Sequence, residues 1–433
     1  MIRATTGGVL KSYRRNLMNS FINVNKSRDT VLSQRNFNSY AEDPVSAARA
    51  FKLRKARMTV ESQYAVCNDV HRKFQTGWNS LESINKLIDT ENGEPMKTLS
   101  GTSLTMLNDP TGDAREQLTK ALDQISQTII QNLNQKYGEN FIFSGADGHN
   151  VPFEIKNDKL YYRGVPVDAA VPTVVKGAGG APMGIDPATG LVAANGTTYV
   201  KDPSSALIKR SDFDDIVIND PTATQPQILK KNAVPGDPQR FNEKGEPDDN
   251  GDYYLNLDQA ETMTQEEYKT AVTDVEKLEY LMNEKQFVDI GLGFQENENG
   301  KLIESSAYNA ALNGLTFIGY GLDSDGDPKN IYSLVQKMKE IGSRVKDGQD
   351  WTKADYDEFD ALVKKLEKAS SEFKTEFTNM GAGTQKLENN VELLEDNFYN
   401  LQEQYSDIED VDMADAITSF IWAQYCYNAA LKV

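Results

Sequence analysis

The chain has 433 residues and a formal net charge of −19, with 46 Lys and Arg against 65 Asp and Glu. A nucleic-acid-binding protein needs a basic face, so this charge argues against nucleic acid as a partner. With 39% hydrophobic residues and a mean hydropathy of −0.57, the sequence is lean for one large core. It fits extended helices that each bury a stripe of side chains.

Residue types that carry catalysis are scarce. The two histidines, His71 and His149, have no second His or Cys at ligand spacing. No arrangement of Ser, His and Asp or of Cys and His emerges, so we expect no enzyme, no metal and no cofactor. A bridge between the two cysteines, Cys67 and Cys426, is conceivable if the chain ends pair, and the sequence leaves this open. The least charged stretch, Ala416–Leu431, is too short and too polar to span a bilayer, so no membrane partner is expected.

The N-terminal part predicts three helices. In the first, apolar residues recur every seven positions, at Leu10, Leu17, Val24 and Val31. Asp43 followed by Pro44 indicates the start of a second, long helix, because Asp caps free N–H groups and Pro suits the first helical position. Its seam repeats at Val60, Cys67, Phe74, Leu81 and Ile88. A third helix is expected from Asp113 to a stop at Gly138, followed by a short strand-like exit.

The middle of the chain changes in composition. Eleven of the fifteen prolines lie between Val151 and Asn250, and helical periodicity disappears there. Turn residues at Asn157 and Asp158, and at Asn195 and Gly196, predict two β-hairpins. We therefore expect a β-rich inserted domain over residues 151–321. Within Asp323–Asp327 the glycine is at the wrong position for a calcium loop, which favours a solvated turn.

The C-terminal part returns to helices from Asn330. Gly381 and Gly383 are expected to break one helix, and the next has apolar residues in steps of four and three, at Leu387, Val391, Leu394, Phe398, Leu401, Tyr405 and Ile408. The register fails after Ile408. A shifted seam then follows at Ile417, Phe420, Gln424, Tyr427 and Leu431.

The two chain ends are complementary in charge as well as in pattern. Residues Met1–Lys73 carry fourteen Lys or Arg against five Asp or Glu, whereas Thr384–Asp415 carries ten acidic residues against one Lys. We therefore expect a mainly α protein in which the N- and C-terminal regions form a long antiparallel bundle or coiled coil around a β-rich central domain. The predicted layers are terminal helices at 1–40 plus 412–433, a bundle at 41–150 plus 322–411, and the insert.

Several segments resemble the flagellin superfamily. Ala41–Ala50 contains an acidic pair after the first helix, and Phe141–Gly145 contains a Phe-Ser-Gly signature. The other similar segments are Asp289–Gly293, Gly314–Gly321 and Glu409–Ile417. Proline directly after the acidic pair is more similar to the hook–filament junction members than to the filament subunits. The resemblance covers both helical ends and the segment that follows the insert, which together make up about two-thirds of the chain.

This resemblance implies a structural subunit of the bacterial flagellum, outside the cell and exported by the flagellar type III route without a cleaved signal peptide. The implied partners are hook-associated protein 1, flagellin, an export chaperone and further copies of itself in a ring. Leu10, Leu17, Val24 and Val31, with the shifted C-terminal seam, would form subunit interfaces. Asp43, Pro44 and the remaining heptad residues would form the bundle seam.

Two other functions remain open on the sequence. One is a flagellin-type filament subunit, which would polymerise by itself into long filaments. The other is a cytoplasmic coiled-coil scaffold or export chaperone, against which the β-rich insert counts.

Overall fold

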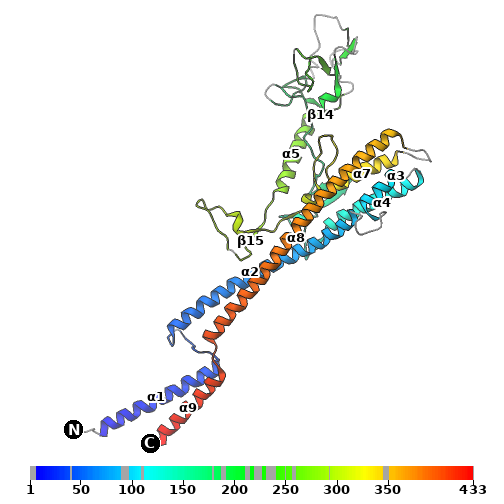
Figure 1. Ribbon diagram of the computed structural model, residues 1–433. Helices are drawn as coiled ribbons and strands as arrows, with labels where there is room; N and C mark the ends of the chain where they lie inside the picture. Colours follow the sequence, from blue (N-terminus) through cyan, green and yellow to red (C-terminus); the bar gives the residue numbers. More distant parts are fainter. Residues whose placement is uncertain are drawn as a thin grey trace. The chain divides into compact units, whose positions relative to one another are not determined.

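The structure is a computed structural model. It describes residues 6–39, 41–88, 97–108, 112–177, 180–186, 192–209, 215–218, 227–230, 240–248, 250–255, 260–291, 293–344 and 351–432. Over these residues the chain is mainly helical, with a central region of small β-sheets (Figure 1), so the predicted fold class is confirmed. The helices are α1 (Thr6–Ser33), α2 (Pro44–Ile88), α3 (Leu99–Asn108), α4 (Gly112–Leu133), α5 (Gln265–Met282), α6 (Leu315–Ile318), α7 (Ile331–Ser343), α8 (Lys353–Glu409) and α9 (Met413–Lys432).

The chain forms two compact units. The terminal unit comprises Met1–Gln75, Phe287–Ala310 and Gly381–Val433, and the central unit comprises Thr76–Gln286 and Ala311–Met380. Helices α2 and α8 contribute residues to both units. The layered division predicted from the sequence concerns an assembled state and stays a prediction.

The terminal unit consists mainly of antiparallel helices. Here α1 lies beside α9, and the first part of α2 packs on the last part of α8. The two-stranded sheet of β15 (Phe287–Val288) and β16 (Tyr308–Asn309) lies in the segment 287–310, which also holds the short 3-10 helix Glu304–Ser306. Apolar residues of α8 face the seam at Leu387 and Leu394, which are 0% and 3% exposed. The heptad pattern therefore marks the buried side of this helix.

The central unit has its own core, in which α4 lies beside α7. Leu122 and Ile129 of α4 and Leu334 and Met338 of α7 are all buried, at four-residue and seven-residue helical spacings. Asn330 accepts a hydrogen bond from the Ser333 N–H (2.8 Å) and so caps α7. The predicted return to helix at Asn330 is confirmed.

The central unit also contains short strands. They are β1 (Lys136–Tyr137), β2 (Asn140–Phe141), β3 (Ser144–Gly145), β4 (Phe153–Lys156), β5 (Lys159–Tyr162), β6 (Val165–Pro166), β7 (Gly184–Ile185), β8 (Val192–Ala193), β9 (Thr198–Val200), β10 (Leu207–Lys209), β11 (Asp215–Ile218), β12 (Gln227–Lys230), β13 (Tyr253–Leu255), β14 (Thr262–Thr264) and β17 (Leu312–Asn313), with the 3-10 helix Pro203–Ala206. The largest sheet has the order β14-β9-β7-β8, and a second has the order β4-β5-β6.

The first predicted hairpin is confirmed and the second is wrong. Strands β4 and β5 pair antiparallel across Asn157 and Asp158, both of which have positive φ, as a tight primed turn requires. Strand β8, however, pairs with β7, which separates it from β9. Gly196 has a different role, because a Cβ atom there would meet the Gly184 carbonyl oxygen at 1.9 Å. Two backbone segments approach each other too closely for a side chain.

Two further expectations are corrected. Helix α4 ends at Leu133, and Gly138 instead makes the turn between β1 and β2, with a φ of 61°. Gly381 and Gly383 do not break α8, which is continuous from Lys353 to Glu409. A helical glycine costs about 1 kcal/mol, and the burial of neighbouring Met380, Thr384 and Leu387 outweighs this cost.

The insert contains a helix that the sequence interpretation missed. Helix α5 begins with a capping box, in which Glu267 N–H donates to the Thr264 hydroxyl and Thr264 N–H donates to the Glu267 carboxylate. Thr264 and Glu267 are three residues apart, which is the sequence signature of such a start. The surrounding prolines and hairpins obscured it. The predicted β-rich insert thus contains an 18-residue helix.

Adjacent leucines in α8 provide a matched test of the seam. Leu394 is 3% exposed and Leu393 is 58% exposed. We expect Leu394→Ala to lower the free energy of unfolding by about 2–5 kcal/mol, because it leaves a cavity, and Leu393→Ala to change it by less than about 0.5 kcal/mol. Urea unfolding of the purified variants measures both values. Equal losses would contradict the assigned seam.

Candidate assembly surfaces

The break between α1 and α2 contacts the break between α8 and α9 within the terminal unit. Asn36, which follows α1, donates its N–H to the carbonyl of Glu409 (2.8 Å), and Val411 N–H donates to the carbonyl of Gln34 (3.1 Å). The Asn36 side chain donates to the carbonyls of Ile408 (3.1 Å) and of Asp410 (2.9 Å). Carbonyls at a helix C-terminus lack intrahelical partners, so Asn36 caps the end of α8. We call residues 34–36 and 408–411 the joint.

A buried carboxylate holds the joint from the side. The Glu409 side chain is 4% exposed and lies 3.1 Å from Arg35 Nη1 and 3.0 Å from Arg54 Nη2. Arg54 also donates to the Tyr405 hydroxyl (2.6 Å), which with Glu409 raises the pKa of this guanidinium above its ordinary value. Since Arg35 follows α1 and Arg54 belongs to α2, Glu409 links three segments of the chain.

The seam between α1 and α9 alternates large and small side chains. Its half-buried or buried members are Tyr13, Leu17, Ser20, Val24, Ser27 and Val31 on α1, and Ala416, Phe420, Ala423, Tyr427 and Ala430 on α9. The Tyr13 hydroxyl donates to the Ala430 carbonyl (2.9 Å), and the rings of Phe21 and Tyr427 lie 5.7 Å apart. Steps of four and three residues on both helices fit a coiled-coil pair.

The structure divides the predicted subunit-interface residues into two groups. Leu17, Val24, Val31, Phe420 and Tyr427 lie in the seam between α1 and α9. The others, Leu10, Ile417, Gln424 and Leu431, lie outside it and are exposed. The actual α9 seam runs through alanines, which a search for large apolar residues does not detect.

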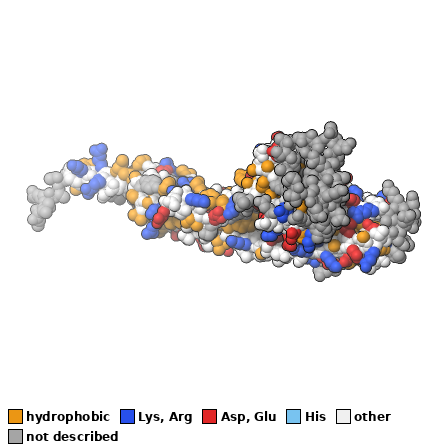
Figure 2. Space-filling model, turned by 90° about the horizontal axis from the view of Figure 1, so that it is seen from above, with side chains coloured by type: hydrophobic (Ala, Val, Ile, Leu, Met, Phe, Trp, Pro, Cys, Tyr) orange, Lys and Arg blue, Asp and Glu red, His pale blue; other side chains and the backbone are white. Residues whose placement is uncertain are grey.

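Both terminal helices also carry apolar side chains away from their shared seam. On α9, Ile421, Trp422 and Tyr425 are 59%, 63% and 68% exposed. On α1, the exposed apolar residues include Val9, Met18, Ile22 and Leu32. In the space-filling view, hydrophobic side chains are exposed over much of the helical surface (Figure 2). Apolar side chains on several sides of a helix are ordinarily buried by several neighbours. Helix α9 therefore needs partners in addition to α1 to bury these side chains.

The predicted bundle-seam residues follow α2 and α8. In the terminal unit, Phe74, Leu387 and Leu394 are buried, and Val60, Val391, Phe398 and Leu401 are half-buried. Leu81 is buried in the central unit.

Asp43 and Pro44 lie at the start of α2 and not in the seam. Asp43 accepts from the N–H groups of Val45 (3.1 Å) and Ser46 (3.0 Å), as an N-cap does. Hydrogen bonds from Ser46, and then from Val45, hold the pKa of the Asp43 carboxyl below its usual value. The predicted helix start is confirmed.

The acidic segment Asp323–Asp327 forms a turn whose central residues, Ser324, Asp325 and Gly326, are exposed, in line with the predicted solvated turn, and a lysine also binds its carboxylates. Lys365 Nζ lies 2.7, 2.9 and 2.5 Å from carboxylates of Asp323, Asp325 and Asp327. Burial alone would raise the pKa of Asp327, but hydrogen bonds from Lys337 and Lys365 lower it overall. The ammonium group thus occupies the centre of these carboxylates. In the described part of the chain, no cluster of His, Cys, Asp or Glu has the arrangement of a metal site.

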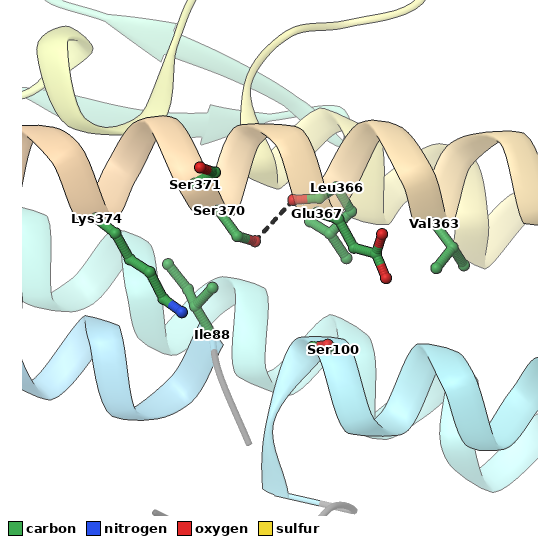
Figure 3. Close-up of a pocket in the computed structure, with 8 residues that line it drawn as sticks. All are labelled: Ile88, Ser100, Val363, Leu366, Glu367, Ser370, Ser371 and Lys374. Carbon is green, nitrogen blue, oxygen red and sulfur yellow. Dashed lines mark hydrogen bonds between the residues drawn. The ribbon is translucent and has the colours of Figure 1, made fainter. Parts of the chain in front are cut away.

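A cavity of about 240 Å³ lies in the central unit beside Ile88, Val363 and Leu366 (Figure 3). Ser370 lines it, but the Ser370 hydroxyl donates to the Leu366 carbonyl of the same helix (2.7 Å). A hydroxyl bound in this way is not an activated nucleophile, which would need an adjacent base. Cys67 is buried and Cys426 is exposed, and neither forms a disulfide.

No described helix has the length and apolar character needed to cross a membrane.

Known proteins match the chain in part. Residues 363–433, which include most of α8 and all of α9, match the family model of the bacterial flagellin C-terminal helical region. No curated protein sequence gives a significant match.

Solved structures with partial likeness come from flagellar proteins. A flagellar hook-associated protein from Vibrio parahaemolyticus is 9% identical, with a TM-score of 0.44 over 85% of this chain and 100% of that one. FlgL from Xanthomonas campestris is 13% identical, with a TM-score of 0.40 over 82% and 99%. Flagellar hook associated protein-3 from Legionella pneumophila is 13% identical, with a TM-score of 0.33 over 84% and 98%. Likeness of this size is not by itself evidence of function.

Glu409 provides a test of the joint. We expect Glu409→Ala to lower the free energy of unfolding by about 1–3 kcal/mol. A hydrogen bond to a charged group contributes about 1.5–3 kcal/mol, and solvent screens these bonds because both arginines are half exposed. Amide exchange should rise at Asn36 and Val411, whose N–H groups bridge the joint. Glu61→Ala, an exposed change on α2, is the control and should leave exchange unaltered. Unchanged protection in Glu409→Ala would show that the backbone bonds alone hold the joint.

Proposed function

We propose that the chain is a structural subunit of the bacterial flagellum that joins the hook to the flagellin filament. The observation that carries this proposal is the match of residues 363–433 to the flagellin C-terminal helical region. This segment supplies α9 and the α8 half of the joint, which are the parts of the terminal unit that hold the N-terminal helices. Pro44, which directly follows the acidic pair as in the junction members that the sequence resembles, supports the junction role over the filament role.

The unpaired apolar surface of the terminal helices supports a role in assembly. Ile421, Trp422 and Tyr425 are exposed in the single chain, and burying such side chains is the main favourable term in stable association. Further copies of the chain, hook-associated protein 1 and flagellin are the partners that this role requires. An export chaperone would cover the same surface before assembly, and the assembled subunit would lie outside the cell.

A flagellin-type filament subunit is the second candidate, because the matched family model is that of flagellin. The two functions differ in what remains when the chain is removed. A junction subunit adds a limited layer, whereas a filament subunit makes up the whole filament.

An in-frame deletion of the gene separates these functions. For a junction subunit, electron microscopy should show intact hooks without filaments, and flagellin should accumulate in the culture supernatant. Loss of the filament protein itself would identify the chain as a flagellin. Normal filaments would reject both functions and favour a coiled-coil scaffold or export chaperone.

Substitutions on α9 test whether its outer face is used in assembly. We expect Ile421→Ser with Trp422→Ser to abolish filament formation in the complemented deletion strain while the subunit is still exported. Both side chains are exposed, so the free subunit should unfold at an unchanged denaturant concentration. Gln424→Ser, on the same helix and also exposed, is the control and should restore filaments. Filaments of normal length in the double variant would show that this face is not an interface.

A further inference from the structure

The outer face of α2 in the terminal unit carries a basic, apolar groove. A shallow hollow of about 550 Å³ lies beside Phe51, Lys55, Met58 and Ser62, and its lining also includes Arg54 and Asp289. The Asp289 carboxylate already accepts a hydrogen bond from Gln63 (2.8 Å). The four residues named first are spaced by four, three and four positions, so they lie on one stripe of the helix. Phe51 and Met58 are 59% and 57% exposed, and they flank the lysine. We call these four residues the α2 stripe.

The outer face of α8 in the same unit has the opposite character. Glu392, Asp396, Tyr399 and Glu403 have the same spacing of four, three and four positions and are half-buried or exposed. Tyr399 is 60% exposed, and its ring meets only the edge of Phe398 among the described aromatic residues. We call these four residues the α8 stripe. It places an aromatic ring between carboxylates, whereas the α2 stripe places an ammonium group between apolar side chains.

The charges of both stripes lack ion-pair partners within the described chain. Lys55 and its exposed neighbour Lys52 form no ion pair there, and neither do Asp396 and Glu403. By contrast, Arg54, on the adjacent side of α2, is already paired with Glu409. The unpaired groups next to the hollow on α2, Lys52 and Lys55, are therefore positive, and those of the α8 stripe are negative.

We propose that the α2 stripe of one copy binds the α8 stripe of a second copy. Tyr399 would enter the groove between Phe51 and Met58, and Asp396 and Glu403 would face Lys55 and Lys52. Equal spacing lets two helices match side chain to side chain along the contact. Complementary charge then selects the register and partner. The proposal rests on the proposed function and names the contact through which copies of the subunit join.

This contact uses a different surface on each of the two copies. Such a contact leaves a free α8 stripe on one copy and a free α2 stripe on the other. Repetition then adds copies in one direction and gives a ring or a helical array. A ring of subunits needs such growth, and a closed dimer would stop it.

Charge reversal with rescue tests the pairing in cells. We expect Lys52→Glu with Lys55→Glu, and separately Asp396→Lys with Glu403→Lys, to abolish filament formation by the deletion strain. Combining all four changes should restore filaments, because the charges are again opposite. Lys386→Glu, an exposed reversal on α8 outside the stripe, is the control and should support normal filaments. Failure of the fourfold variant, with each double variant exported and folded, would overturn the contact.

A cysteine pair tests the contact directly. Arg57 donates to Gln402 within one chain, so positions 55 and 396 of the same chain lie eight residues apart along the helix pair. At about 1.5 Å per residue this is roughly 12 Å, which is more than a disulfide spans. Lys55→Cys with Asp396→Cys, in a Cys426→Ser chain, should therefore give bonds only between copies. Isolated hooks with attached filaments, oxidised and run without reductant, should show a ladder of several copies.

The crosslinking outcomes separate this contact from the proposed function. Lys55→Cys with Lys386→Cys is the matched control and should give no ladder. Bands that stop at two copies would overturn the array, and an adduct with the mass of one copy plus flagellin would assign the groove to flagellin instead. If immunogold labelling finds the chain at the junction but no ladder forms, the function stands and the contact fails. If no label is found on flagella, the function fails as well.

Discussion

The antiparallel pairing of the two chain ends is the constraint on which the terminal unit depends. Neither α1 nor α9 can bury its apolar side chains alone, and most of the stability of a helix in a protein comes from the packing of its apolar face. Tyr13 and Phe21 of α1 contact Ala430 and Tyr427 of α9, residues more than 400 positions away in the sequence. The α1–α9 pair therefore forms only when both ends of the chain meet.

The joint binds the two helical breaks to each other. Helix ends expose carbonyls without partners, and each break alone would leave these groups to water. Here Asn36 binds the end of α8, and Glu409 draws Arg35 and Arg54 onto the same point. The net effect of such a partly buried ionic cluster on stability is small, because burying charge is costly. We therefore assign it the role of fixing where the break occurs.

The terminal unit separates internal contacts from surfaces available to partners. Its seam between α1 and α9 combines large and small residues, which allows close helix packing. Its outer faces carry exposed aromatic residues on α9, a basic groove on α2 and unpaired carboxylates on α8. Aromatic side chains and complementary charge are common at protein interfaces. Surfaces of different character on different helices suit a subunit that meets several neighbours.

The sequence by itself determined the helical ends, the seam of α8, most of the α1 seam, the Asp43 cap and the break after Ile408. These follow from local periodicity and capping, which any segment carries in its own residues. It also indicated the flagellar resemblance, and the family-model match over 363–433 supports this at the C-terminus. Helix α5 was detectable in principle from Thr264 and Glu267.

Only the tertiary structure decided the features that depend on distant neighbours. Gly381 and Gly383 stay helical because buried residues on either side hold α8 together. Strand β8 does not pair with β9, because β7, which precedes both in the sequence, lies between them in the sheet. Lys365 closes the acidic turn from a helix 38 residues beyond Asp327. The α9 seam runs through Ala416, Ala423 and Ala430, because close approach to α1 favours small side chains over the larger ones that periodicity alone selects.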